Sequence, residues 1–302
     1  MLNIYLKIRS KLNIGYKIMT ISLEDKLILI TGATSGIGEA TAIELSKFNP
    51  TLILLGKNSK KGEKVSEKIR KISENKKIDF FNVNLSSQTE IRNFAKKYNE
   101  KYDRLDILIN NAGINAFRRQ ITEDGIERIF AVNHLAYFLL TNLLLDTIRK
   151  NPPVKIINVS SGAHWGSTIN FEDINYKKTR FNGWKVYGQS KLANIMFTYS
   201  LAERLKDTGV TVNCLHPGQV RTNIVKLYGL GKFWRYNPFN FSATESALNG
   251  PVFLAMSKKV ENVTGKYFYD KKERRTSPIS KNKEVQEKLW KMCEQMTELK
   301  NN

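Results

Sequence analysis

The chain alternates short, almost wholly apolar runs with longer segments of helical periodicity, and Gly, Asn or Pro stands at most of the joins. A run that is apolar at nearly every position is typical of a strand covered on both faces, as in a parallel sheet. The expected strands are Lys26–Thr31, Thr51–Leu55, Ile78–Val83, Leu105–Asn110, Val154–Ser160, Val210–His216 and Gly265–Tyr269. The expected helices are Gly36–Phe48, Lys61–Glu74, Thr89–Tyr102, Glu123–Lys150, Trp184–Lys206, Ala243–Met256 and Lys283–Leu299. This alternation predicts an α/β fold with a doubly wound parallel sheet, in one domain over residues 24–302.

Residues 1–23 do not fit the pattern of that domain. Four basic residues interrupt Ile and Leu there, no acidic residue occurs before Glu24, and the apolar runs are too short to span a bilayer. Three interpretations stay open: an amphipathic segment for targeting or membrane-surface contact, a disordered tail, or upstream sequence before a start at Met19.

The charge balance bears on the kind of partner. The chain has 49 basic and 28 acidic residues, a formal net charge of +21, which raises the question of nucleic acid or an anionic membrane. The lysines are spread over most of the expected helices, and no nucleic-acid-binding motif is present. We therefore expect a solvated cationic surface and no nucleic-acid partner.

The cysteines and histidines indicate neither a disulfide scaffold nor a metal site. Cys214 and Cys293 are far apart, no CxxC pair occurs, and the three histidines form no HExxH motif. A reducing compartment fits this pattern, so the expected location is the cytoplasm, with membrane association through residues 1–23 as the alternative. The oligomeric state stays open between monomer and homodimer.

The first apolar run leads into a glycine-rich turn and then a helix. Gly32 lets the chain turn sharply, Gly36 lets the backbone approach a pyrophosphate, and Gly38 allows close packing of helix on sheet, while the helix amides face the anion. The GxxxGxG spacing is wider than the GxGxxG of the common dinucleotide-binding fold. The residues expected to contact the pyrophosphate are Gly32, Thr34, Ser35, Gly36, Ile37 and Gly38.

The ends of the second and third expected strands bear on the choice of dinucleotide. No acidic residue follows the second strand, where an NAD site places Asp or Glu against the ribose, and Lys57 stands there instead. A cation at that point pairs with a 2′-phosphate and favours NADP(H) over NAD(H), although an ordinary surface lysine is the alternative. Asn84 and Leu85 close the third strand where an adenine ring would lie, and Asn84 can offer a carbonyl and an amide to it.

Three side chains form a candidate catalytic group. Tyr187 and Lys191 are four residues apart in an expected helix and so share one face. A nearby ammonium favours the charged form of a phenol and makes Tyr187 a usable general acid or base. Ser161 follows the fifth strand, at the sheet edge where ligands gather, although a serine there is more often a turn former. Asn133 lies within an expected helix, where such an amide is more often solvated than functional.

Together these motifs resemble the short-chain dehydrogenase/reductase family, and within it the retinol dehydrogenase-like group. The matching pieces are TGATSGIG at Thr31–Gly38, NNAG at Asn110–Gly113, Asn133, NVSSGAH at Asn158–His164, YGQSKLAN at Tyr187–Asn194, HPGQVRT at His216–Thr222, VTGKYF at Val263–Phe268 and KLWKMCEQMT at Lys288–Thr297. Several motifs in order are far more specific than any one of them. The resemblance covers residues 24 to 297.

The resemblance implies a single Rossmann domain and an oxidoreductase in which hydride passes between the nicotinamide of NADP(H) and an alcohol or carbonyl. Tyr187 is then the general acid or base on the substrate oxygen, and Ser161, the second serine of its pair, holds that oxygen by a hydrogen bond. Lys191 binds the nicotinamide ribose and lowers the pKa of Tyr187, while Asn133 anchors a water relay to solvent. Residues that resemble family contacts to the adenosine ribose and the nicotinamide amide are Asn110, Ala112, Pro217, Gly218 and Val220.

The chain departs from the family pattern at two cofactor positions. Asn84 stands where the family usually has Asp, and Lys57 stands where the retinol dehydrogenase-like group usually has Arg. Lysine supplies a point charge without the planar fork of arginine, so NAD(H) stays open as the less favoured cofactor. The amino-terminal segment also lacks the long apolar anchor of some relatives.

The substrate is expected to be apolar and bulky, such as a retinoid, a lipid aldehyde or a steroid-like carbonyl. Residues 227–241 hold five aromatic side chains where this family closes a lid over substrate: Phe233, Trp234, Tyr236, Phe239 and Phe241. The alternative is that these rings pack the lid onto the core. Two other functions stay open, a broad carbonyl reductase without lipid specificity and a catalytically silent cofactor-binding scaffold.

Overall fold

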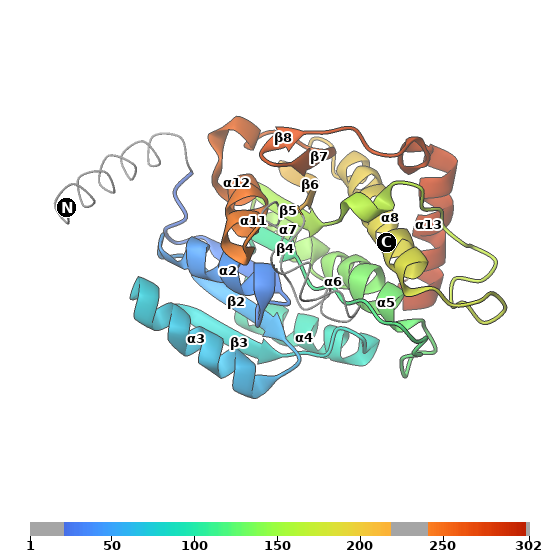
Figure 1. The fold of residues 1–302 in the computed structure, drawn as a ribbon. Helices are drawn as coiled ribbons and strands as arrows, with labels where there is room; N and C mark the ends of the chain where they lie inside the picture. Colours follow the sequence, from blue (N-terminus) through green and yellow to red (C-terminus); the bar gives the residue numbers. More distant parts are fainter. Residues whose placement is uncertain (1–20, 219–240, 300–302) are drawn as a thin grey trace.

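A computed structural model describes residues 21–218 and 241–299, and these residues form one eight-stranded sheet with helices on both faces (Figure 1). The strand order is β3-β2-β1-β4-β5-β6-β7-β8, and all neighbours are parallel except β7 and β8. The strands are β1 Leu27–Thr31, β2 Thr51–Gly56, β3 Ile78–Asn82, β4 Ile107–Asn110, β5 Val154–Val159, β6 Val210–His216, β7 Lys266–Tyr269 and β8 Lys272–Glu273. The expected doubly wound sheet in a single domain is confirmed, and the seven expected strands all form.

The short strand β8 is the one that the sequence pattern misses. It is only two residues long and both are exposed, so it has no apolar run to mark it. Asp270 and Lys271 take positive φ angles of 50° and 60° in the turn between β7 and β8. Two consecutive residues of that kind form the tight turn that suits a two-residue hairpin.

The sheet separates two apolar cores, and the alternation of side chains along β1 shows how. Leu27 and Leu29 belong to one core, while Ile28 and Ile30 belong to the other. The first core is covered by α4 Gln88–Lys101, α6 Ala136–Leu143, α7 Leu145–Lys150, α8 Gly183–Arg204 and α13 Lys283–Thr297. The second core is covered by α2 Gly36–Ser46, α3 Ser59–Ser73, α11 Ala243–Asn249 and α12 Pro251–Met256. Burial on both faces explains why the strands are apolar at nearly every position.

Two expected helices are wrong in their continuity. The helix predicted from residue 123 to 150 starts only at α5 Arg128–Phe130, continues through a π-helical turn at Ala131–Leu135, and breaks at Leu144 before α7. It starts late because Gly125 takes a φ of 75° and the side chain of Glu127 caps the next turn by accepting from the amide of Phe130.

The helix predicted over residues 243–256 is also divided. Gly250 takes φ −121° and ψ −102°, outside the helical region, and ends α11. Pro251 then starts α12, at a position where its missing N–H is not needed.

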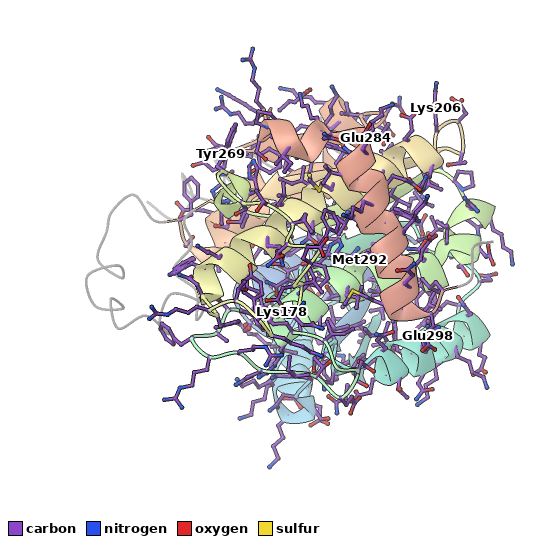
Figure 2. All side chains as sticks on the ribbon, turned by 90° about the vertical axis from the view of Figure 1, so that its right-hand side faces the viewer. Lys178, Lys206, Tyr269, Glu284, Met292 and Glu298 are labelled. Carbon is purple, nitrogen blue, oxygen red and sulfur yellow. The ribbon has the colours of Figure 1, made fainter. Side chains whose placement is uncertain are left out.

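The carboxyl-terminal helix α13 lies along α8 on the outside of the first core (Figure 2). In Figure 2 the helix faces the viewer, with Glu284 near its start and Glu298 just after its end. Its Trp290 ring packs against Phe138 and Phe197, with centroid separations of 4.9 Å and 5.8 Å. This aromatic cluster holds α13 against α6 and α8, the second of which carries Tyr187 and Lys191.

The amino-terminal segment enters the fold at its described end. The amide of Ile21 donates to the carbonyl of Met256 at 2.7 Å, and Leu23 is buried in the second core. Within the described part of the chain, no helix combines the length and the apolar character that crossing a membrane requires.

Candidate active site

The turn after β1 requires glycine at three points. Gly32 and Gly36 take positive φ angles of 65° and 58°, which side chains with a Cβ rarely adopt. A Cβ on Gly32 would lie 2.8 Å from Cα of Ala112, and one on Gly38 would lie 2.3 Å from the carbonyl oxygen of Gly32. The close packing expected at Gly38 is therefore confirmed, and the turn leaves backbone exposed at the start of α2.

This turn lies at the switch point of the sheet, where β1 and β4 are neighbours and the chain leaves them in opposite directions. A cavity of about 420 Å³ opens there, at the carboxyl ends of the strands. The expected site residues that line it are Gly32, Thr34, Ser35, Gly36, Ile37, Lys57, Asn84, Leu85, Ala112, Ser161, Tyr187, Lys191, Pro217 and Gly218. Its bare glycine backbone and the start of α2 suit an anionic dinucleotide. Val220 and most of the aromatic stretch lie outside the described residues.

Lys191 is buried beneath Tyr187 on the inner side of the cavity. Its Nζ donates to the carbonyl oxygen of Val159 at 3.0 Å and lies 5.6 Å from the ring centroid of Tyr187. Burial lowers the pKa of Lys191 to about 7. Tyr187 is partly exposed and faces the cavity, one turn before Lys191 on α8. The expected pair therefore shares one face of α8, with the Lys191 amine close to the Tyr187 ring.

The two adjacent serines after β5 have different surroundings. Ser160 is buried, and its hydroxyl donates to the carbonyl of Lys191 at 2.7 Å, so it ties β5 to α8. The Ser161 Oγ accepts from the amide of Ala163 at 3.2 Å, and no acceptor among the described residues takes its hydroxyl proton. His164 lies behind it and donates from Nδ1 to the Ser161 carbonyl at 2.7 Å. The serine whose hydroxyl can still donate into the cavity is thus Ser161.

Asn133 is fully buried, so it is not a solvated helix position of the kind that such an amide more often occupies. Its Oδ1 accepts from the amide of Ile114 at 2.7 Å, and its Nδ2 donates to the Ile114 carbonyl at 3.0 Å and to Ser190 at 3.1 Å. Asn133 lies in the π-helical turn, and its own carbonyl accepts from Asn194 at 2.9 Å. Asn133 does not line the cavity but joins the loop after β4 to α8, next to Lys191.

Asn110 itself does not line the cavity, although the next residues of the chain do. Its side chain is fully buried and donates to Thr141 at 3.1 Å and to Asn158 at 2.9 Å, so it holds β4 against β5 and α6. The neighbouring Asn111 lines the cavity and donates to the carbonyl of Thr31 at 2.9 Å. The side chain of Asn110 is thus engaged within the fold, and the contact of Asn110 with a ribose stays a prediction.

At the end of the cavity where an adenosine was expected, Asn84 is oriented by its own turn. Its Oδ1 accepts from the Ser86 hydroxyl at 2.8 Å, and its backbone amide donates to Glu90 at 2.8 Å. The carbonyl side of Asn84 is therefore engaged, which leaves its amide N–H groups to face an adenine.

Several residues that line the cavity were not expected from the sequence, among them Arg128, Val132, Trp184 and His216. Arg128 and Val132 are four residues apart and share a face of the helical segment after β4, and Trp184 precedes Tyr187 by about one turn. Helical spacing counted back from Tyr187 would have found Trp184.

Comparison with known proteins identifies the family. The family model described as short chain dehydrogenase matches residues 26–230. The chain belongs to the short-chain dehydrogenase family. Retinol dehydrogenase 13 of Mus musculus is 39% identical over 276 residues, which cover 89% of this chain and 83% of that protein. Retinol dehydrogenase 11 of Homo sapiens is 34% identical over 285 residues, which cover 94% of this chain and 89% of that protein.

A solved structure is also similar over nearly the whole chain. An uncharacterized protein from Mycobacterium paratuberculosis has a TM-score of 0.75 at 29% identity, with 92% of this chain and 96% of that chain covered. This short-chain dehydrogenase is therefore an oxidoreductase that acts on CH–OH donors, as the sequence motifs predict.

Proposed function

We propose that this short-chain dehydrogenase moves hydride between NADP(H) and an alcohol or carbonyl of an apolar substrate, with Tyr187 as the general acid or base. The observation that carries the proposal is the convergence of Tyr187, Ser161 and Lys191 with the glycine turn in one cavity. The bound cofactor would supply or accept the hydride at its nicotinamide.

The residues of the cavity divide the remaining work. Tyr187 gives a proton to the carbonyl oxygen during reduction, or takes one from the alcohol during oxidation. Ser161 donates its hydroxyl proton in a hydrogen bond to the same oxygen and holds it next to the phenol. Lys191, when protonated, stabilises the phenolate of Tyr187 through its positive charge. Asn133 keeps the loop after β4 and α8 in register beside Lys191.

The choice of NADP(H) is supported by Lys57, which lines the cavity after β2 where no acidic residue occurs. We expect Lys57→Glu to raise the Kd for NADPH by roughly 10- to 100-fold, because a carboxylate would repel a 2′-phosphate. The Kd for NADH should change little. Fluorescence titration with both dinucleotides measures the ratio of the Kd for NADPH to the Kd for NADH.

Lys60→Glu is the matched control for that substitution. Lys60 is an exposed lysine in the first turn of α3 and does not line the cavity. Reversal of its charge tests long-range electrostatics alone. An unchanged NADPH-to-NADH ratio in Lys57→Glu would show that Lys57 does not read the phosphate.

An apolar substrate is supported by the aromatic rim of the cavity and by the similarity of the chain to retinol dehydrogenases 13 and 11. Trp184 is 50% exposed and stands edge-on to the Tyr187 ring at 6.1 Å between centroids. Phe241, the described member of the aromatic stretch, lies against Gly218, where an added Cβ would be 2.3 Å from its ring. Apolar surface therefore borders the candidate catalytic tyrosine on α8 and the loop after β6.

We expect Trp184→Ala to raise KM for a bulky apolar aldehyde such as retinal by roughly fivefold, since a half-buried ring contributes about 1 kcal/mol to such a contact. The KM for a small aldehyde should stay within twofold. Trp165→Ala is the control, because Trp165 is similarly exposed, at 54%, but does not line the cavity. Equal effects of Trp184→Ala on both aldehydes would count against an aromatic substrate contact.

The test of the proposal as a whole is a panel of aldehydes and ketones with purified protein, followed at the absorbance of NADPH. The panel should include retinal, steroid-like ketones and small quinones. Turnover of the bulky apolar members supports the proposal, equal turnover of small quinones favours a broad carbonyl reductase, and NADPH binding without any turnover favours a cofactor-binding scaffold.

A further inference from the structure

Arg128 is a second cation at the adenosine end of the cavity, and it reaches that place from a different part of the fold than Lys57. Lys57 follows β2, whereas Arg128 is the first residue of α5, in the crossover from β4 to β5. Both side chains line the main cavity. Both also line an adjoining hollow, whose other lining residues include Gln120 and Asn84. The two cations therefore border the same space.

The loop before α5 holds Arg128 in place. Its backbone amide donates to the carbonyl of Gln120 at 2.9 Å, and Ile121 and Glu127 form an antiparallel bridge beside that bond. Its guanidinium also donates from one terminal nitrogen to the Gln120 side-chain oxygen. Backbone and side chain are thus anchored to one neighbouring residue, which reduces the entropy lost when a ligand binds.

The charge of Arg128 is not balanced by an ion pair among the described residues, because none of their carboxylates lies within 4.0 Å of its guanidinium. Gln120 is a neutral partner and engages one of the five N–H donors. A guanidinium that has no ion pair and uses only one of its donors can present two coplanar N–H groups to a doubly charged oxyanion.

We propose that Arg128, together with Lys57, binds the 2′-phosphate of NADP(H). The inference rests on the proposed use of a nicotinamide dinucleotide and assigns a second phosphate-binding residue from the β4–β5 crossover. Asn84 is the reference point, since it borders the same hollow and is the residue expected beside the adenine. A phosphate on the adjacent ribose would then lie between the ammonium of Lys57 and the guanidinium of Arg128. The planar donors of Arg128 would supply the paired hydrogen bonds that a lysine at residue 57 cannot make.

The experiment measures binding of two fragments that differ only in the phosphate, 2′,5′-ADP and 5′-AMP, together with NADPH and NADH. We expect Arg128→Met to weaken 2′,5′-ADP and NADPH by roughly 10- to 100-fold, the effect of losing charged hydrogen bonds, and to change 5′-AMP and NADH by less than about twofold. Arg128→Lys should recover part of the loss, because it restores the charge without the fork. Arg149→Met is the control, since Arg149 is an exposed arginine on α7 that does not line the cavity.

The outcomes separate this inference from the proposed function. Unchanged affinity for 2′,5′-ADP in Arg128→Met, while the wild type prefers it to 5′-AMP, overturns the role of Arg128 alone. Equal loss of both fragments also overturns it and places the guanidinium against the adenine ring instead. If the wild type binds neither NADPH nor NADH, the proposed function fails first. NADH affinity serves as the internal check that each variant is folded.

Discussion

Tyr187→Phe should reduce turnover by roughly 100- to 10,000-fold, the range that a positioned general acid or base contributes, while NADPH binding stays within about twofold. The reason is that the substitution removes one hydroxyl from the rim of the cavity and leaves the glycine turn, Lys57 and Lys191 in place. Single-turnover kinetics with saturating NADPH, paired with a fluorescence titration of the cofactor, measures the two effects separately.

Tyr137→Phe is the matched control. The Tyr137 ring lies 5.8 Å from Lys191 Nζ, close to the 5.6 Å of Tyr187, but Tyr137 is buried, donates its hydroxyl to the Ala112 carbonyl at 2.7 Å and does not line the cavity. We expect it to lose about 1 to 3 kcal/mol of stability through the unpaired carbonyl and to keep most of its turnover. Wild-type-like rates in Tyr187→Phe, or equal losses in the two variants, would refute the assignment of Tyr187.

The sheet could be predicted because strands buried on both faces have a distinctive pattern. Each expected strand is apolar in nearly every position, and the alternation of Leu27 and Leu29 with Ile28 and Ile30 between two cores is the physical cause. Once the sheet is parallel, the loops after its strands must meet at one edge. Tyr187, Ser161, Lys57 and the glycine turn were therefore expected in one place, and the structure brings them to one cavity.

The buried polar residues could not be placed in this way. The side-chain amides of Asn110 and Asn133 donate to partners that are distant in sequence, Asn158 and Ser190, so no local pattern distinguishes them from surface amides. The π-helical turn around Asn133 is likewise invisible to a helical period, because it adds one residue to a single turn.

A chain of polar contacts that starts on α13 likewise joins residues that are distant in sequence. Cys293 lies 3.3 Å from Nε2 of His134, whose Nδ1 lies 2.9 Å from Asn194. Asn194 in turn donates to the carbonyl of Val159 at 3.3 Å, the same oxygen that Lys191 contacts. In the sequence Cys293 stands alone, whereas the fold connects it to the surroundings of Lys191.

The burial of Lys191 implies that this residue lowers the free energy of unfolding of the protein. Its pKa falls from 10.5 to about 7 through burial, and a shift of that size corresponds to a cost of about 5 kcal/mol for the charged form. Its hydrogen bond to Val159 offsets part of this cost, but Asn194 also donates to that carbonyl and would keep it satisfied. We therefore expect Lys191→Met to raise the free energy of unfolding at pH 6 by about 2 to 3 kcal/mol and Tm by roughly 4 to 8 °C, and to reduce turnover by at least roughly 100-fold.

The pH dependence identifies the cause of that gain. Between pH 7 and 10.5 the unfolded chain keeps the Lys191 proton that the folded chain has lost, so the stability of the wild type rises with pH relative to Lys191→Met. Because the shift is worth about 5 kcal/mol, the gain in Lys191→Met should be largest below pH 7 and should become a deficit of about 2 to 3 kcal/mol above pH 10.5. Denaturant titrations at pH 6, 8 and 10 measure it. Lys155→Met is the control for activity. Lys155 is a largely buried lysine on the opposite face of the sheet, and burial lowers its pKa to about 8. It does not line the cavity, so its loss should leave turnover unchanged. A pH-independent difference in stability would mean that packing, and not the buried charge, separates Lys191→Met from the wild type.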